Sequence, residues 1–208
     1  LEANGPVSME TDWFVLREAR LQLASYTHPH LPVAVANVLT PAGATTAGKH
    51  GVGVLSIGAS MPGGLVSLAE TWRWAEEAAQ GAGKTVSRDD WRLVVHMHLA
   101  DSKEEAFRNV EDGRFAELKQ YWQGTLDRVA PSNPRFDTLE FAAEAGGIVI
   151  GTPDDAIAAI ERMLDLSGGF GGVLFIAQEW GSREANLRSY ELFARYVAPH
   201  FRNQLGPR

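Results

Sequence analysis

The chain has 208 residues, of which 26 are acidic, 19 are basic and none is cysteine, so its formal net charge is −7. A hydrophobic fraction of 45% and a charged fraction of 22% are typical of globular proteins and exclude an intrinsically disordered chain. The lack of cysteine excludes a disulfide framework, a thiolate metal site and a cysteine nucleophile.

Length and charge also limit the partners. The basic residues are dispersed, so no cluster predicts binding to a nucleic-acid backbone. No run approaches the roughly 20 apolar residues that cross a bilayer, and no export signal is visible, so we expect a cytoplasmic protein with no membrane partner. A single domain over residues 1–208 is expected. Because the chain starts at Leu1 without Met, it is expected to be a piece of a longer protein.

After a loop-rich N-terminal segment at residues 1–30, apolar runs alternate with amphipathic runs. The short apolar runs are typical of strands buried on both faces, and the runs with three- and four-residue apolar spacing are typical of helices. Strands are predicted at residues 32–37, 51–57, 91–100, 147–151 and 171–177, and helices at 41–50, 64–80, 101–122, 138–145, 152–164 and 182–197.

This alternation predicts an α/β protein whose parallel strands are joined by right-handed crossovers. Two architectures fit, an open doubly wound sheet and a closed eight-stranded barrel. Neither a Gly-x-Gly-x-x-Gly turn nor a complete Walker-type Gly-x-x-x-x-Gly-Lys-Ser/Thr sequence is present. A barrel normally needs about 250 residues, and only about half of its strands are predicted here.

The segment at residues 35–43 is the most informative candidate site. A strand ends there, Thr40 stands at a predicted N-cap and Pro41 at the first helical position, and small residues follow. Free backbone N–H groups and the positive end of a helix dipole would form a site for an anion such as phosphate. The alternative is that Thr40 is only a good N-cap.

Two further candidates lie at predicted strand ends. His96 and His98 are two residues apart on one strand and therefore point to the same side, where they would bind a metal, transfer protons or simply be core residues. Glu179 and Trp180 follow the last predicted strand. Glu179 is either an acid/base group or a solvated residue, and Trp180 either a ligand-binding wall or packing for the final helix.

The remaining polar residues predict no catalytic group. His28 and His30 flank a proline in a loop and are interpreted as a surface turn, so no metal site is predicted. Neither Ser56 nor Ser60 has the two glycines of a Gly-x-Ser-x-Gly nucleophile elbow, so no hydrolase triad is predicted.

Four segments of the chain resemble a known family. Residues 9–14, 34–43, 47–56 and especially 187–199, which read LRSYELFARYVAP, are similar to the flavin-dependent, bacterial luciferase-like monooxygenases. Within that family the chain most resembles the branch of limonene-monooxygenase-like or alkane-oxidising enzymes. The resemblance covers almost the whole chain.

The resemblance implies a TIM (β/α)8 barrel of the luciferase-like type, of which this chain would be the C-terminal part. It also implies reduced FMN delivered by a separate flavin reductase, and O2 from which one oxygen atom enters a small organic, hydrocarbon-like substrate. By position, Asn37 and Thr40 fall where the fifth barrel strand of the family contacts the flavin and its phosphate. Ala42 and Gly43 match the helix start that offers backbone donors.

The first half of the family's barrel has no counterpart here, so the catalytic residues stay unknown and the chain is expected to be incomplete as a catalyst. One alternative is a non-catalytic half barrel that associates with copies of itself, because exposed strand edges and open sheet faces favour association into a homo-oligomer. Another is a deazaflavin-dependent oxidoreductase of the same superfamily.

Overall fold

A computed structural model describes residues 5–20, 22–23, 25–28, 31–61, 63–111, 138–144, 146 and 148–202. The chain divides into two compact units, Leu1–Val33 and Ala34–Arg208. The helix predicted over residues 101–122 lies outside the described residues from residue 112 onward.

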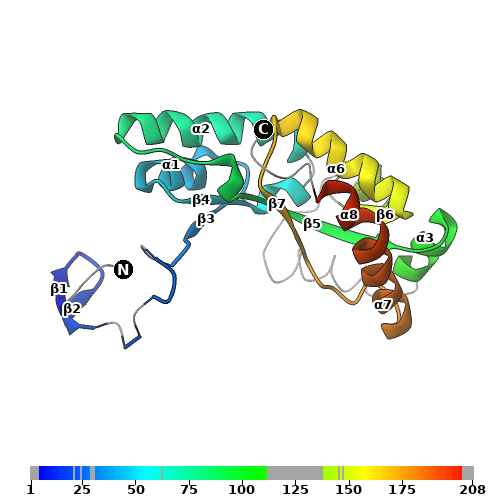
Figure 1. Cartoon of the computed structure of the whole chain (residues 1–208), viewed down its shortest axis with the longest axis horizontal. Helices are drawn as coiled ribbons and strands as arrows, with labels where there is room; N and C mark the ends of the chain where they lie inside the picture. Colours follow the sequence, from blue (N-terminus) through cyan, green and yellow to red (C-terminus); the bar gives the residue numbers. More distant parts are fainter. Residues whose placement is uncertain are drawn as a thin grey trace. The chain divides into compact units, whose positions relative to one another are not determined.

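The first unit contains an antiparallel hairpin formed by β1 (Val7–Glu10) and β2 (Val15–Ala19) (Figure 1). At its turn the Thr11 hydroxyl donates to the carbonyl oxygen of Phe14 and accepts the Phe14 N–H, both at 3.1 Å. The sequence predicts a loop-rich segment here and does not predict the hairpin. The reason is that its strands are short and exposed, so they lack the apolar alternation of a half-buried strand.

The second unit alternates strands and helices as predicted. Its strands are β3 (Ala34–Asn37), β4 (Gly53–Ser56), β5 (Trp91–Leu99), β6 (Ile148–Gly151) and β7 (Gly172–Phe175). Its α-helices are α1 (Pro41–His50), α2 (Leu68–Gly81), α3 (Lys103–Glu111), α5 (Leu139–Glu144), α6 (Pro153–Ser167), α7 (Arg183–Leu192) and α8 (Ala198–Phe201). A short 3-10 turn, Leu65–Ser67, precedes α2 where the sequence predicted continuous helix.

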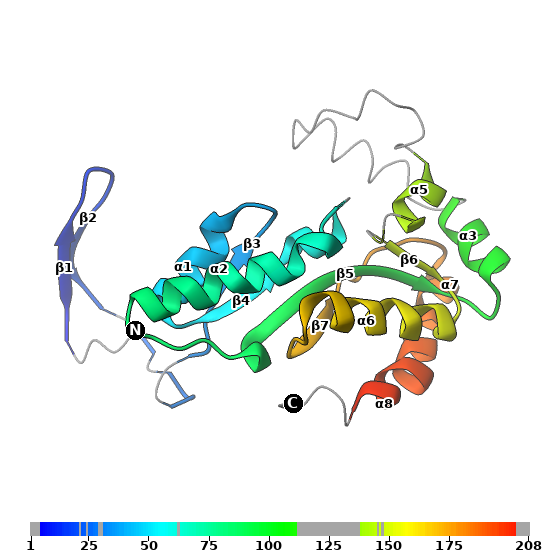
Figure 2. The same cartoon turned by 90° about the horizontal axis from the view of Figure 1, so that it is seen from above.

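The five strands form one parallel sheet centred on β5 (Figure 2). The order is β3-β4-β5-β6, and β7 also pairs with β5. β7 pairs with Arg92–Val95 and β6 with the last four residues of β5, so the long central strand has three neighbours. The predicted α/β class with parallel strands is confirmed, and the described strands do not close into a barrel.

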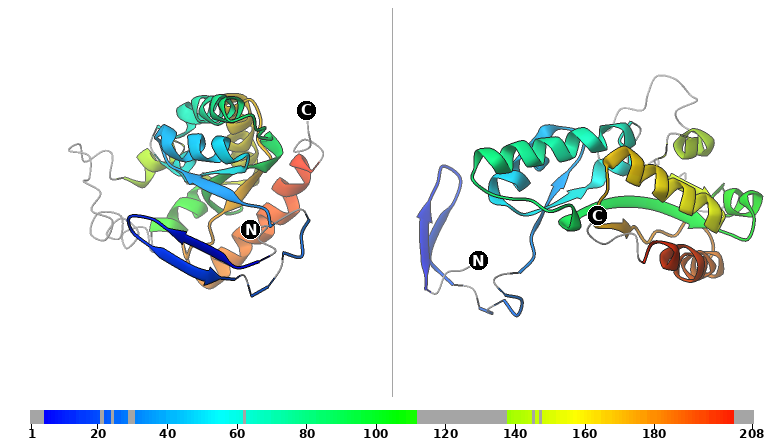
Figure 3. Two further views of the ribbon diagram at one scale, coloured as in Figure 1. Left: turned by 90° about the vertical axis from the view of Figure 1, so that its left-hand side faces the viewer. Right: turned by 45° about the horizontal axis from the view of Figure 1, so that its top comes forward.

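Strand register divides the sheet into two faces. Val54, Trp91 and Leu93 point to the face on which α1, α2 and α6 lie, and they belong to the main hydrophobic core (Figures 1 and 3). The alternating residues, among them Ala36 and Leu174, point to the opposite face. Leu174 is 45% exposed there, whereas His96 and His98 on the same face are buried, so this second face is open only in part, around β3 and β7, in the described part of the chain.

The segment at residues 187–199, which carries the family resemblance most strongly, has a structural role in this chain. The buried Ser189 hydroxyl accepts the N–H of Leu99 at 2.9 Å, and Arg188 pairs with Asp101 at 2.6 Å. The rings of Tyr190 and Phe193 contact the ring of Phe175. These contacts attach α7 to the ends of β5 and β7.

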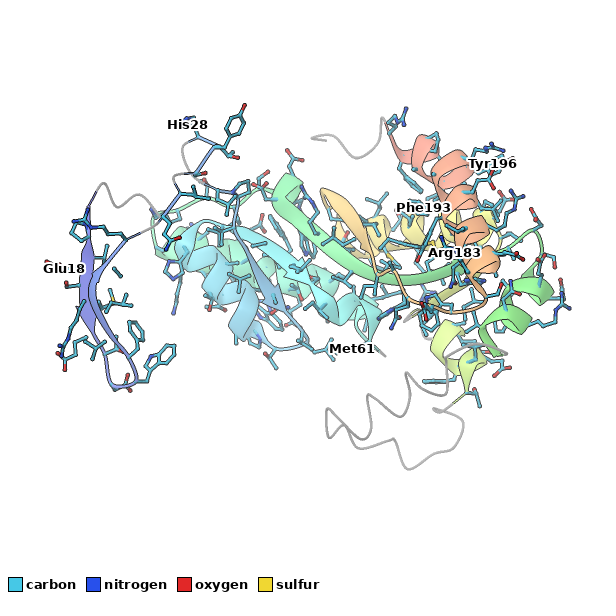
Figure 4. All side chains as sticks on the ribbon, turned by 90° about the horizontal axis from the view of Figure 1, so that it is seen from below. Glu18, His28, Met61, Arg183, Phe193 and Tyr196 are labelled. Carbon is cyan, nitrogen blue, oxygen red and sulfur yellow. The ribbon has the colours of Figure 1, made fainter. Side chains whose placement is uncertain are left out.

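The last helix is not uniform, which corrects the prediction of one helix over residues 182–197. A π-helical turn, Phe193–Val197, joins α7 to α8. Pro199 has no N–H to donate to a carbonyl of the preceding turn, and a wider turn accommodates this loss. Figure 4 shows Phe193 and Tyr196 on different sides of this turn; Tyr196 is 53% exposed.

Candidate functional site

The carboxyl ends of the parallel strands meet at one edge of the sheet, which is where α/β proteins place their sites. β3 ends at Asn37, β4 at Ser56, β5 at Leu99 and β7 at Phe175. The predicted site residues therefore lie near this edge, either in the last residues of a strand or in the segment that follows it. The strands concerned are β3 for residues 37–43, β5 for residues 96 and 98, and β7 for residues 179 and 180.

The start of α1 is attached to the end of β3 by Asn37. This side chain is 1% exposed; its Oδ1 accepts the N–H of Ala44 at 3.1 Å, and its Nδ2 donates to the Val38 carbonyl at 3.3 Å. Asn37 was predicted to bind a cofactor, and in the structure its side chain holds the start of α1. The sequence gives no signal for this contact because it joins residues seven positions apart.

Thr40 is the N-cap of α1 and Pro41 its first residue, as predicted, but the Thr40 hydroxyl makes no capping hydrogen bond. The same Thr-Pro pair begins α6, and there the hydroxyl does cap. Thr152 Oγ1 accepts the N–H of Asp155, and Asp155 Oδ2 accepts the N–H of Thr152 at 2.8 Å, which completes a capping box. The two similar sequences therefore differ in whether the threonine hydroxyl is used by the helix.

The donors left at the start of α1 suit an anion. The N–H groups of Ala42 and Gly43 have no acceptor within the helix, because the first residues of any helix lack one. Thr40 and Ala42 are exposed, and the first turn contains no acidic residue that would repel a phosphate. The helix dipole adds positive potential at the same place.

Close backbone approach explains two glycines here. A Cβ on Gly43 would lie 2.3 Å from the Ala36 carbonyl oxygen and 2.9 Å from Asn37 Oδ1. A Cβ on Gly58, in the turn after β4, would lie 2.0 Å from the Val38 carbonyl oxygen. Any side chain at these positions would push the helix start and the neighbouring turn away from the end of β3.

His96 and His98 point to the same face of β5, as predicted, and both are buried, with exposed fractions of 5% and 0%. Burial lowers the pKa of His98 to about 4. Burial also lowers the pKa of His96, and the nearby Gln178 side chain, which favours the charged imidazole, opposes that shift. Both imidazoles are therefore neutral at pH 7.

Glu179 and Trp180 have different environments. Glu179 is exposed, whereas Trp180 is 3% exposed and its ring lies 5.8 Å from the His96 ring in an edge-on arrangement. Trp180 packs with Ala106 and Val110 of α3 in a second, smaller core. This places Trp180 beside α3 and the histidine pair, whereas one sequence alternative placed it against the final helix.

The other candidates carry no site in the described residues. Ser56 Oγ accepts the indole N–H of Trp91 at 2.9 Å, which makes it part of the core. Among the residues that the structure describes, no group of three or more His, Asp or Glu residues is arranged to hold a metal ion. Within the same residues, no helix is long and apolar enough to span a membrane.

Two curated proteins are similar in sequence over the whole chain. Limonene 1,2-monooxygenase from Rhodococcus erythropolis is 41% identical over 100% of this chain and 53% of its own length. A 4-hydroxyprotoasukamycin monooxygenase from Streptomyces nodosus subsp. asukaensis is 38% identical over 99% of this chain and 56% of its own. The chain thus spans about half the length of the curated relatives it matches. No family model matches it.

Solved structures show the same fold. Monooxygenase RslO1 from Streptomyces bottropensis superposes with a TM-score of 0.73 at 23% identity, over 96% of this chain and 57% of that one. The oxygenating constituent of 3,6-diketocamphane monooxygenase from Pseudomonas putida, solved with FMN, gives 0.67 at 24% identity, over 93% and 57%. An F420-dependent secondary alcohol dehydrogenase gives 0.59 at 20% identity, over 94% and 56%.

Proposed function

We propose that this chain, which belongs to the flavin-dependent, luciferase-like monooxygenases, forms the part of such an enzyme that binds the phosphate of reduced FMN. The proposed site consists of the Thr40 hydroxyl and the backbone N–H groups of Ala42 and Gly43. Asn37 would position these donors from the end of β3. The whole protein would be an oxidoreductase that inserts one atom of O2 into an organic, hydrocarbon-like substrate.

The free hydroxyl of Thr40 carries this proposal. In α6 the equivalent threonine caps the helix, whereas in α1 the buried Asn37 side chain accepts a helix N–H and the Thr40 hydroxyl makes no capping bond. A hydroxyl and two N–H groups at the positive end of a helix match the oxygen atoms of a phosphate.

The residues of this chain contribute binding and orientation. Gly43 lets the helix start lie against Ala36 and Asn37, which keeps the first N–H groups of α1 at the sheet edge. The open sheet face, with Ala36 and the partly exposed Leu174, supplies apolar surface suited to a hydrocarbon-like substrate. The chemistry that reduced FMN supplies when bound is the reduction of O2, with electrons delivered by a separate reductase.

A deazaflavin is the alternative cofactor, because two solved neighbours are described as F420-dependent. Both curated relatives are named monooxygenases, which favours FMN. Because the open face exposes apolar side chains such as Leu174, we also propose that the chain associates with copies of itself. Sedimentation of a folded monomer at all concentrations would contradict this association.

Cofactor titration tests the proposed site. FMN added to the chain is expected to bind weakly, because the relatives are about twice as long, and Thr40→Ala is expected to weaken binding further. Riboflavin has the same ring without the phosphate, so it should bind no better to the wild type than to the variant. Equal affinity of the wild type for FMN and riboflavin would contradict the proposal.

A further inference from the structure

Four buried polar atoms lack a hydrogen-bond partner at the carboxyl ends of β5 and β7. They are Nδ1 of His96, Nδ1 of His98, Oε1 of Gln178 and Nε1 of Trp180. Leaving such an atom unpaired costs about 1–3 kcal/mol, and most buried polar atoms in folded proteins are paired. Elsewhere in the described residues only Trp72 Nε1, in the core beneath α2, is in the same state.

Contacts join these side chains into one group, which we call the polar cluster. The His96 ring lies 5.8 Å from the Trp180 ring, and Gln178 lies two residues before Trp180 in the same segment, where its side chain affects the pKa of His96. His98 is two residues further along the same face of β5. Its other ring nitrogen, Nε2, already lies 3.3 Å from Asn109 Nδ2, so only Nδ1 is available.

The atom types restrict what the cluster can bind. The indole N–H of Trp180 can only donate, and Oε1 of Gln178 can only accept. A group that satisfies both must carry an acceptor and a donor. The four side chains are neutral at pH 7, so an ion placed among them would remain uncompensated in a buried environment. A neutral group is therefore required.

We infer that the polar cluster binds a neutral group with adjacent donor and acceptor atoms on a ligand at this edge of the sheet. Two ligands have this chemistry: the imide edge of a flavin ring, and a hydroxyl of an organic substrate or product. The inference rests on the proposed function only in placing a ligand at this edge. Residues 176–182, which carry Gln178 and Trp180, form neither helix nor strand, and Ala177 and Glu179 are exposed.

Nuclear magnetic resonance of the 15N-labelled chain tests the inference through its indole N–H signals. The probes are lumiflavin, a flavin ring without phosphate, and cyclohexanol, a neutral alcohol. Trp180→Phe and Trp72→Phe each remove one buried, unpaired indole N–H and assign its signal. Trp72→Phe is the matched control, because Trp72 stacks on Trp91 on the helix-covered face.

We expect a probe to shift the Trp180 signal and to leave the Trp72 signal in place. Trp180→Phe should weaken binding of that probe about tenfold, and Trp72→Phe should leave it unchanged. A shift with lumiflavin alone identifies the flavin ring as the ligand, and a shift with cyclohexanol identifies the hydroxyl. If neither probe moves the Trp180 signal, or both tryptophan signals move together, the inference is overturned.

Two features keep this test independent of the phosphate site. Neither probe carries a phosphate, so Thr40→Ala should leave the shift of the Trp180 signal unchanged. If Trp180→Phe does not fold, the shift in the wild type still decides, and Gln178→Met removes the acceptor while keeping the side-chain volume.

Discussion

Replacing Gly43 by alanine tests how tightly α1 is held against the sheet edge. The new Cβ would lie 2.3 Å from the Ala36 carbonyl oxygen and 2.9 Å from both Cα and Oδ1 of Asn37. Backbone atoms cannot rotate away from this contact, so the helix start must move. That movement breaks the hydrogen bond between Ala44 N–H and Asn37 Oδ1.

The expected destabilisation is about 2 kcal/mol. Overpacking of this kind costs about 1–3 kcal/mol and the lost hydrogen bond about 1 kcal/mol, while alanine in a helix gains about 1 kcal/mol over glycine. For a chain of this size a loss of about 2 kcal/mol lowers the melting temperature by roughly 4–8 °C. Affinity for FMN should fall as well, because the N–H donors move with the helix.

Gly81→Ala is the matched control. Gly81 is the last residue of α2, and a Cβ there would meet nothing within 4 Å. This variant should be as stable as the wild type or slightly more stable, by up to about 1 kcal/mol. Urea denaturation followed by circular dichroism measures both variants. The close contact of Gly43 with Ala36 and Asn37 would be refuted if Gly43→Ala were as stable as the wild type, or if Gly81→Ala lost as much stability as Gly43→Ala.

Three further predictions concern stability. Thr152→Ala should lower the free energy of unfolding, measured by urea denaturation, by about 1 kcal/mol, because Thr152 forms the capping box of α6. Thr40→Ala should change it by no more than about 0.5 kcal/mol. Equal losses would be inconsistent with the different roles assigned to the two residues. Ser189→Ala should lower the free energy of unfolding by about 1–3 kcal/mol, because it leaves the buried Leu99 N–H unpaired. Thr46→Ala removes an exposed hydroxyl bonded to the Ala42 carbonyl and should leave the stability nearly unchanged. A Ser189→Ala variant as stable as the wild type would argue against the attachment of α7. The free energy of unfolding should fall as the pH drops from about 6.5 to about 4. In this range the unfolded chain gains a proton on His98, whereas the folded chain, in which the pKa of His98 is about 4, does not. His98→Gln should remove roughly 3 kcal/mol of this pH dependence, and an unchanged pH profile would contradict the depressed pKa.

Local sequence signals predicted the second unit well. The Thr-Pro start and the following glycine gave α1 its observed bounds, Pro41–His50, and the apolar run gave β5 to within one residue. These signals depend on residues close together in the chain, such as a proline at the first helical position and a left-handed glycine after the last.

Features that depend on distant residues could not be predicted. The sequence does not show that Asn37, and not Thr40, would satisfy a helix N–H, because that depends on how β3 meets α1. Nor does it show that Trp180 would lie against His96, 84 positions earlier in the chain, since that contact requires β5 and the segment after β7 to be neighbours. The π turn before Pro199 was also not predicted, because the apolar spacing of residues 182–197 does not distinguish it from a regular α-helix.

The amide signals of Ala42 and Gly43 test most directly whether the start of α1 binds the FMN phosphate. Nuclear magnetic resonance of the 15N-labelled chain can detect even weak binding at these two groups. We predict that FMN shifts both signals, that riboflavin does not, and that Thr40→Ala reduces the response to FMN. Unmoved signals with FMN, or equal shifts with FMN and riboflavin, would contradict the account.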